Sequence, residues 1–99
     1  MIERIVIMTF LPERVQEFMD IFDSSSASIR QFSGCNGLRL LQNKEKLFQL
    51  TTYSLWESDL ALENYRNSAL FASTWAKTKV LFMEKPLAFS SVITREVIG

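Results

Sequence analysis

Aromatic and polar side chains are the groups of this sequence best suited to chemistry, and they gather between residues 53 and 75. They are Tyr53, Trp56, Tyr65 and Trp75, with Asn64, Arg66 and Asn67 as neighbours. Phenol and indole groups, helped by an amide or a cation, can bind an aromatic anion, orient it and exclude water. Each residue also has a simpler interpretation as core or, for Arg66, as a solvated charge. Tyr65 is the most even case, because a buried hydroxyl needs a partner.

Histidine is absent and there is a single cysteine, Cys35. Histidine is the commonest general base and metal ligand and the usual haem ligand. A lone cysteine is more often an inert side chain than a nucleophile. The three glycines form no phosphate-binding motif. We therefore expect no haem, flavin or zinc, and the residues name no catalytic acid or base.

The totals predict one domain over residues 1–99. Eleven basic and eleven acidic side chains cancel, without a basic run, so we expect no nucleic-acid partner. We find no signal peptide and no stretch near the ~20 apolar residues of a membrane span. The default expectation is a soluble, cytoplasmic protein.

The first half of the chain predicts a strand, a long helix and a second strand. Residues 2–11 form a strand with an Ile-Val-Ile centre typical of a central position. Pro12 suits the first turn of a helix, and Gly34 ends it. The Ser24–Ser26 run is a weak point for helix propensity, but the stripe continues past it. That stripe is Val15, Phe18, Met19, Phe22, Ile29 and Phe32. Residues 38–42 form a short strand.

The second half predicts a strand, an interrupted helix and a last strand. Residues 47–56 pair antiparallel with 38–42 across a polar turn. Ser58 caps a helix that runs to about residue 83, and Asn67-Ser68 breaks and restarts it. Residues 88–98 form the last strand. The order β-α-β-β-α-β is the ferredoxin-like α+β pattern, with an antiparallel sheet and helices on one face.

The third strand is apolar on both sides. Phe48, Leu50 and Trp56 lie on one side, and Leu47, Tyr53 and Leu55 on the other. Two helices can cover only one face of the sheet, so the other needs a second cover. In so short a chain we expect that cover to be another copy of itself, which makes the protein a homodimer with a large apolar interface.

The strand-to-helix junction carries a recurring pattern. It reads Trp56-Glu57-Ser58-Asp59, a short helix with Tyr65, then Asn67-Ser68 and Leu70-Phe71; the turn Phe32-Ser33-Gly34-Cys35-Asn36-Gly37-Leu38 adds to it. With these motifs, nearly the whole chain resembles the antibiotic biosynthesis monooxygenase-like domains of the dimeric α/β barrel superfamily. The resemblance implies a homodimer whose sheets pack face to face, with a cavity in each subunit between sheet and helices.

The resemblance does not extend to the haem-degrading branch of that family. Aligned from Trp56, the haem-ruffling Trp and the iron-binding His of that branch fall on Tyr65 and Trp75, and its first-strand Asn falls near Thr9. Tyr65 is not readily equated with the ruffling Trp, and Trp75 cannot ligate iron. Haem degradation by that route is therefore not expected.

The quinone-forming branch works without metal or flavin, since an electron-rich phenol gives an electron to oxygen itself. The resemblance thus implies a cofactor-independent monooxygenase-like oxidoreductase acting on a small aromatic or quinone-like compound. The alternative is a non-catalytic dimeric domain of the same fold, which binds a small molecule or is an orphan. The missing histidine favours this alternative somewhat, and the residues leave both open.

The expected place of a ligand is between the sheet and the second helix, lined by Trp56, Tyr65, Phe71 and Trp75. Trp56 ends a strand, and the helix returns over the sheet at once. The break at Asn67-Ser68 lets Tyr65 and Trp75 face a shared space, whereas one straight helix would set them roughly 80° apart. This set supplies a phenol and two indole N–H donors to an otherwise apolar pocket.

Overall fold

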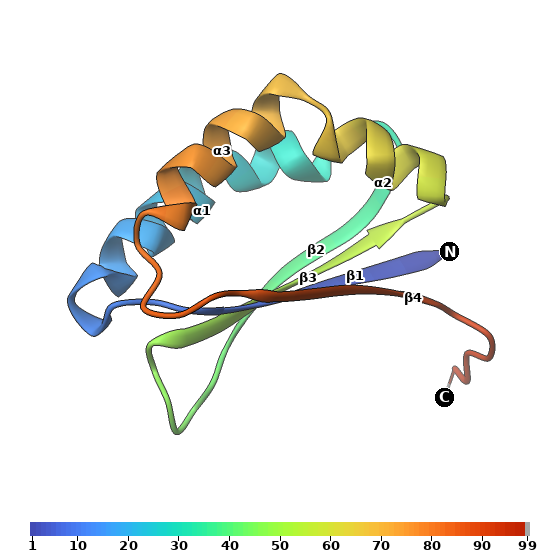
Figure 1. The fold of residues 1–99 in the computed structure, drawn as a ribbon. Helices are drawn as coiled ribbons and strands as arrows, with labels where there is room; N and C mark the ends of the chain where they lie inside the picture. Colours follow the sequence, from blue (N-terminus) through green and yellow to red (C-terminus); the bar gives the residue numbers. More distant parts are fainter. Residues whose placement is uncertain (99) are drawn as a thin grey trace.

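The computed structural model describes residues 1–98, so Gly99 of the predicted domain lies outside the described residues. Its elements confirm the predicted α+β, ferredoxin-like order, with the second helix divided in two (Figure 1). They are β1 (Ile2–Thr9), the 3-10 turn η1 (Pro12–Arg14), α1 (Val15–Arg30), β2 (Cys35–Gln42), β3 (Gln49–Trp56), α2 (Asp59–Arg66), α3 (Ala69–Lys79) and β4 (Leu87–Val92).

The four strands form one antiparallel sheet in the order β2-β3-β1-β4. The central position predicted for the Ile-Val-Ile strand is confirmed, because β1 lies between β3 and β4. The predicted β2–β3 hairpin is also confirmed, with a register irregularity between Cys35 and Gly37. In the shared register Ile5 lies opposite Tyr53 on one side and Phe89 on the other.

Several strand and helix ends differ from the predicted ones. The last strand ends at Val92 rather than at residue 98, because Val92 lies opposite Ile2, where β1 begins. The last helix ends at Lys79 rather than near residue 83. Beyond the helix, Phe82 forms an isolated antiparallel β-bridge with Phe10, so this segment pairs with the chain after β1 and does not continue the helix.

The long helix α1 passes unbroken through the serine run. The hydroxyls of Ser24 and Ser25 both donate to the carbonyl oxygen of Ile21, so these side chains are satisfied within the helix itself. Phe18 and Ile29 are the buried members of its apolar stripe. The helix therefore tolerates the serine run, because buried apolar side chains before and after the run pack it onto the rest of the protein.

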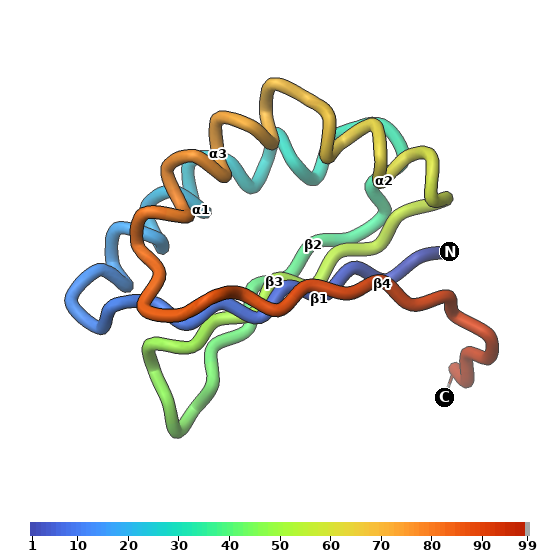
Figure 2. The backbone as a smooth tube through the Cα atoms, in the orientation of Figure 1, coloured from blue at the N-terminus to red at the C-terminus, as the bar shows by residue number. Residues whose placement is uncertain are grey.

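The predicted break in the second helix is confirmed. Ser58 caps α2 by accepting a hydrogen bond from the Ala61 N–H at 3.1 Å, and Ser68 caps α3 in the same way from the Phe71 N–H at 3.1 Å. The backbone changes direction between these helices, as the tube shows (Figure 2). Two serine caps ten positions apart thus mark the starts of two short helices.

All helices lie on one face of the sheet, and the other face is uncovered (Figure 1). Strand alternation puts Leu50 and Trp56 on the helix side, where both are fully buried. On the open side, Phe89 keeps 46% of its surface exposed and Leu87 64%. Within residues 1–98 the structure has no helix long and apolar enough to cross a membrane.

Candidate functional site

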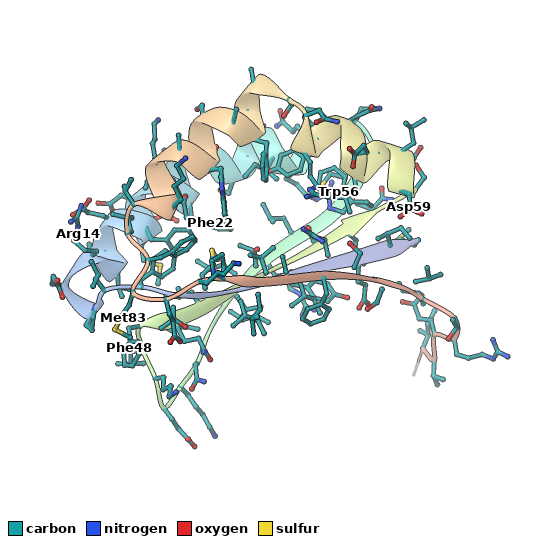
Figure 3. All side chains as sticks on the ribbon, viewed as in Figure 1. Arg14, Phe22, Phe48, Trp56, Asp59 and Met83 are labelled. Carbon is teal, nitrogen blue, oxygen red and sulfur yellow. The ribbon has the colours of Figure 1, made fainter. Side chains whose placement is uncertain are left out.

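A cavity of about 110 Å³ lies between the sheet and the helices and is partly open to solvent. Its floor comes from β1, β2 and β3 and its walls from α1, α2 and α3. Figure 3 shows Trp56 and Phe22 in this layer between helices and sheet. The four residues predicted to line a ligand site, Trp56, Tyr65, Phe71 and Trp75, all border this one cavity. Their role in binding stays a prediction.

Trp56 borders the cavity from the end of β3. Its side chain is fully buried in a cluster with Ile2, Cys35 and Leu62. The indole N–H donates to the Ser54 hydroxyl at 2.9 Å. The expectation of two free indole donors is therefore wrong, because the polar atom of Trp56 is already paired with its own strand.

The aromatic rings form a continuous wall. The Tyr65 ring stacks on Trp56 at 4.9 Å between centroids and meets Phe71 edge-on at 5.3 Å. Phe71 then stacks on Trp75 at 6.0 Å, with only 9° between the ring planes. Offset-stacked and edge-on pairs are the preferred aromatic geometries. A flat aromatic molecule would find matching ring faces along this wall.

Tyr65 is the polar group set into this wall. Its hydroxyl makes no hydrogen bond to any of residues 1–98 that the structure describes, and it is not fully enclosed. Burial, with a smaller contribution from the Cys35 thiol, raises the pKa of Tyr65 to about 12. The phenol therefore stays protonated near neutral pH and can donate a hydrogen bond to a ligand, but it cannot act as a base there.

Two cations border the same cavity, and sequence reasoning missed one of them. The sequence predicts Arg66 as a solvated charge, and its side chain is 47% exposed. The cation that the sequence analysis does not name is Arg4. The signal that could have found it is strand alternation, since Arg4 shares a face of β1 with Val6 and Met8.

The other polar candidates lie outside the cavity. Tyr53 is on the open face of the sheet, where its hydroxyl donates to the Glu3 carboxylate and the Arg39 guanidinium lies 4.4 Å from its ring centroid. Asn64 and Asn67 are exposed, and Asn67 donates to the Glu63 carboxylate. The Thr9 hydroxyl, near the position of the family's first-strand Asn, accepts a hydrogen bond from Gln49 away from the cavity. Tyr53, Asn67 and Thr9 thus have local partners of their own, and Asn64 is simply exposed.

The described residues do not form a cluster of metal ligands. Among residues 1–98, no group of three or more His, Cys, Asp or Glu side chains is arranged to hold an ion. Cys35 is buried, with its sulfur 3.6 Å from the Gly37 carbonyl oxygen. The lining of the cavity is largely apolar and aromatic, and its polar groups include the Tyr65 phenol and two guanidinium groups.

Comparison with solved structures shows many chains of the same fold. A conserved protein from Methanosarcina mazei Go1 superposes with a TM-score of 0.87 at 21% identity, over 91% of this chain and 89% of the other. A protein from Mycobacterium tuberculosis gives 0.89 at 16% identity, over 98% of each chain. A structure described as an antibiotic biosynthesis monooxygenase gives 0.89 at 13% identity, over 96% of this chain and all of that one.

At these identities the structural likeness establishes the fold alone. A search of curated protein sequences finds no match. The family model for antibiotic biosynthesis monooxygenase, however, matches residues 1–77, which include β1 to α2 and most of α3. This chain therefore belongs to the antibiotic biosynthesis monooxygenase family.

Proposed function

We propose that this protein is a cofactor-independent monooxygenase-like oxidoreductase that acts on a small aromatic or quinone-like compound in the cavity between sheet and helices. The observation that carries the proposal is the cavity itself. Its wall is a run of stacked and edge-on rings, and the Tyr65 hydroxyl in that wall has no hydrogen-bond partner within residues 1–98. Apolar pockets with a few placed polar groups are the usual form of a small-molecule site.

The size and chemistry of the cavity suit one aromatic ring with a further part projecting outward. A cavity of about 150 Å³ is known to hold benzene, and this one is about 110 Å³ with an open side. The ring would pack along Phe71 and Trp75, and an oxygen substituent would accept from Tyr65. This arrangement binds the substrate, orients it and keeps water from its reactive carbon.

The reaction needs only the substrate and oxygen. A phenolic compound with an activated CH₂ group, such as an anthrone, loses a proton to solvent and becomes an anion. The anion transfers one electron to O₂, and the resulting radical pair combines to a peroxide anion at that carbon, which takes up a proton from water to become a hydroperoxide. Loss of water leaves a new carbonyl, so CH₂ and O₂ give C=O and H₂O. The neutral Tyr65 phenol supports this sequence by donating a hydrogen bond to the substrate oxygen.

A second copy of the chain belongs to the same proposal, in the compartment predicted for it, the cytoplasm. The open face of the sheet presents Ile5, Ile7, Leu55, Leu87 and Phe89, all on the side away from the helices. The Tyr53, Glu3 and Arg39 side chains lie on this face too, and the exposed apolar area beside them is typical of an interface. Packing two such faces together would bury both and leave each cavity on the outside of the dimer.

Oxygen uptake tests the proposal directly. Purified protein is mixed with hydroquinones and anthrone-like phenols, and the rate is compared with autoxidation in the presence of the heat-denatured protein. We expect faster uptake, one O₂ consumed for each anthrone oxidised, and one ¹⁸O atom from ¹⁸O₂ in the new carbonyl. A chelator should leave the rate unchanged. Binding of these compounds with no acceleration would instead favour the non-catalytic binding domain.

A further inference from the structure

Two arginines from different elements border the cavity. Arg4 projects from β1 on the helix-covered face of the sheet, and Arg66 is the last residue of α2. Residues 62 positions apart are thus brought to one site. Burial lowers the pKa of the Arg4 guanidinium below its usual range, and the charge of Arg66 lowers it further. An arginine nonetheless remains protonated in proteins, so both positive charges persist.

Neither charge is neutralised by the cavity. Not one of the described residues that border it is Asp or Glu. Within residues 1–98 Arg4 forms no ion pair, and its side chain donates only to the neutral Ser90 hydroxyl at 3.1 Å. Arg66 is 3.9 Å from Glu63 on the exposed side of α2, where such pairs are weak.

The two positive charges favour an anionic ligand. A partly buried guanidinium loses hydration, and a second guanidinium beside it adds repulsion. An anion placed between the two would reverse both effects. Guanidinium groups also match the geometry of oxyanions, to which they can donate two parallel hydrogen bonds.

We propose that Arg4 and Arg66 select an anionic substrate: an aromatic ring that carries an ionised oxygen group. The ring lies against Tyr65, Phe71 and Trp75, and the anionic oxygen lies between the two guanidinium groups. This inference rests on the proposed function, because it takes the same cavity to be the substrate site. To the proposed function it adds that the substrate is negatively charged and that Arg4 and Arg66 bind this charge.

Benzoate and benzamide test this charge selection, because they share one ring and nearly one shape but differ by a charge. Binding is followed by ¹H–¹⁵N chemical shifts, with the Trp75 indole N–H as a reporter at the cavity. We expect benzoate to bind about tenfold or more tightly than benzamide, since charged hydrogen bonds are the stronger kind. Raising the salt concentration should weaken benzoate alone.

Substitutions then assign the effect to the two arginines. Arg4→Gln and Arg66→Gln should each lower benzoate affinity by about tenfold and leave benzamide affinity unchanged. Arg66→Gln alters an exposed side chain, so it keeps the test valid if Arg4→Gln does not fold; Arg4→Lys should retain part of the preference. Arg14→Gln is the matched control, because Arg14 pairs with Glu17 on the surface and does not border the cavity.

The outcomes separate this inference from the proposed function. Equal binding of benzoate and benzamide, or unchanged benzoate binding in both glutamine variants, overturns the charge selection and leaves the cavity as a ligand site. Failure of both compounds to bind the wild-type protein contradicts the charge selection and the proposed function together. Benzoate preference that is lost in Arg14→Gln as well would show a general surface effect and overturn the assignment.

Discussion

The rings of Trp56 and Tyr65 lie nearly parallel, with 23° between their planes and 4.9 Å between their centroids. Trp56 is fixed by full burial and by its hydrogen bond to Ser54. Tyr65 is held in turn by edge-on contacts from Phe32 and Phe71. The position of the Tyr65 hydroxyl is therefore set by ring packing alone, and that oxygen can be removed without disturbing what holds the ring.

Tyr65→Phe should weaken the binding of a phenolic ligand and leave the fold intact. The ring contacts remain, and only a donor without a partner in residues 1–98 is lost. We expect affinity for an anthrone-like phenol to fall by about 0.5–1.5 kcal/mol, the usual net value of one neutral hydrogen bond. The free energy of unfolding in urea should change by less than about 0.5 kcal/mol.

Tyr53→Phe is the matched control for that substitution. It deletes the same atom on the opposite face of the sheet, where the hydroxyl donates to Glu3. Ligand affinity should not change in this variant. Equal affinities in wild type and Tyr65→Phe for each phenol that binds would show that the hydroxyl plays no part in the site.

The features of the fold that local chemistry determines could be predicted from the sequence. The serine caps at Ser58 and Ser68 are local signals, and they mark where α2 and α3 begin. The end of the last strand is not local. It depends on where β1 begins, because Val92 pairs with Ile2, while β-branched residues such as Ile93 and Val97 continue in the sequence beyond that pair. Prediction therefore extended that strand too far.

Some features of the candidate site could likewise be predicted from the sequence, and others could not. Helical spacing and the break at Asn67-Ser68 were enough to bring Tyr65 and Trp75 to one cavity. The loss of the Trp56 donor could not be seen, since it depends on the rotamer that brings the indole to Ser54. Tyr53 could have been set apart from Trp56 by counting, because an odd separation along a strand puts two side chains on opposite faces.

The pH dependence of stability should carry the signature of Tyr65. Its pKa is about 12 in the folded state, raised by burial from the ordinary value of 10. The unfolded chain loses this proton first, so the stabilising contribution is complete below pH 10 and falls as the pH rises from 10 to 12. We expect the urea midpoint to drop in that window, and to drop less in Tyr65→Phe.

An absorbance titration isolates the same group. There are two tyrosines, so Tyr53→Phe leaves Tyr65 as the one phenol that ionises. Its absorbance change at ~295 nm should come well above the pH of a free tyrosine, consistent with burial of the phenol. A transition near the ordinary pKa would mean that Tyr65 is solvated and does not line a closed wall.

Gly34→Ala should destabilise the protein by about 1–3 kcal/mol. Gly34 has a φ of 85°, a conformation that disfavours a side chain, and a Cβ there would clash with the Cβ of Ala61 on α2. The close approach lets the turn after α1 pack against α2. Gly37→Ala is the control: its Cβ would meet the flexible Leu55 side chain at 3.2 Å, so the loss in urea unfolding should be smaller.

Phe89→Glu should convert the proposed dimer to a monomer. Phe89 lies on the open sheet face beside Ile5, and a buried carboxylate in an apolar interface is strongly unfavourable. Light scattering should then change from twice the chain mass of 11.4 kDa to that mass itself. Ala88→Glu, one residue away on the other face of β4, should stay dimeric. A wild-type protein that is monomeric at micromolar concentration would rule out this interface.

Trp56→Ala and Trp75→Ala should separate stability from binding. Trp56 is fully buried, so its truncation should cost about 3–5 kcal/mol, a large part of the stability of a small domain. Trp75 is only partly buried, and we expect a smaller loss of about 1–3 kcal/mol. Urea unfolding at one fixed protein concentration measures both, because a dimer's stability depends on concentration.

The loss of ligand affinity should be larger at Trp75 than at Trp56, the reverse of the order for stability, in variants that remain folded. Trp75→Ala removes a ring face that stacks on Phe71 at the cavity, so affinity for an aromatic ligand should fall. Trp56→Phe keeps a ring beneath Tyr65 and frees the Ser54 hydroxyl, so it should cost stability and leave affinity nearly unchanged. Each variant retains one of the two tryptophans, and the fluorescence of that tryptophan can report ligand binding. In Trp56→Phe we expect the ligand to quench the fluorescence of Trp75, because Trp75 borders the part of the cavity where the ring lies. Quenching of Trp56 alone would place the ligand deeper, against β3, and contradict the wall formed by Phe71 and Trp75.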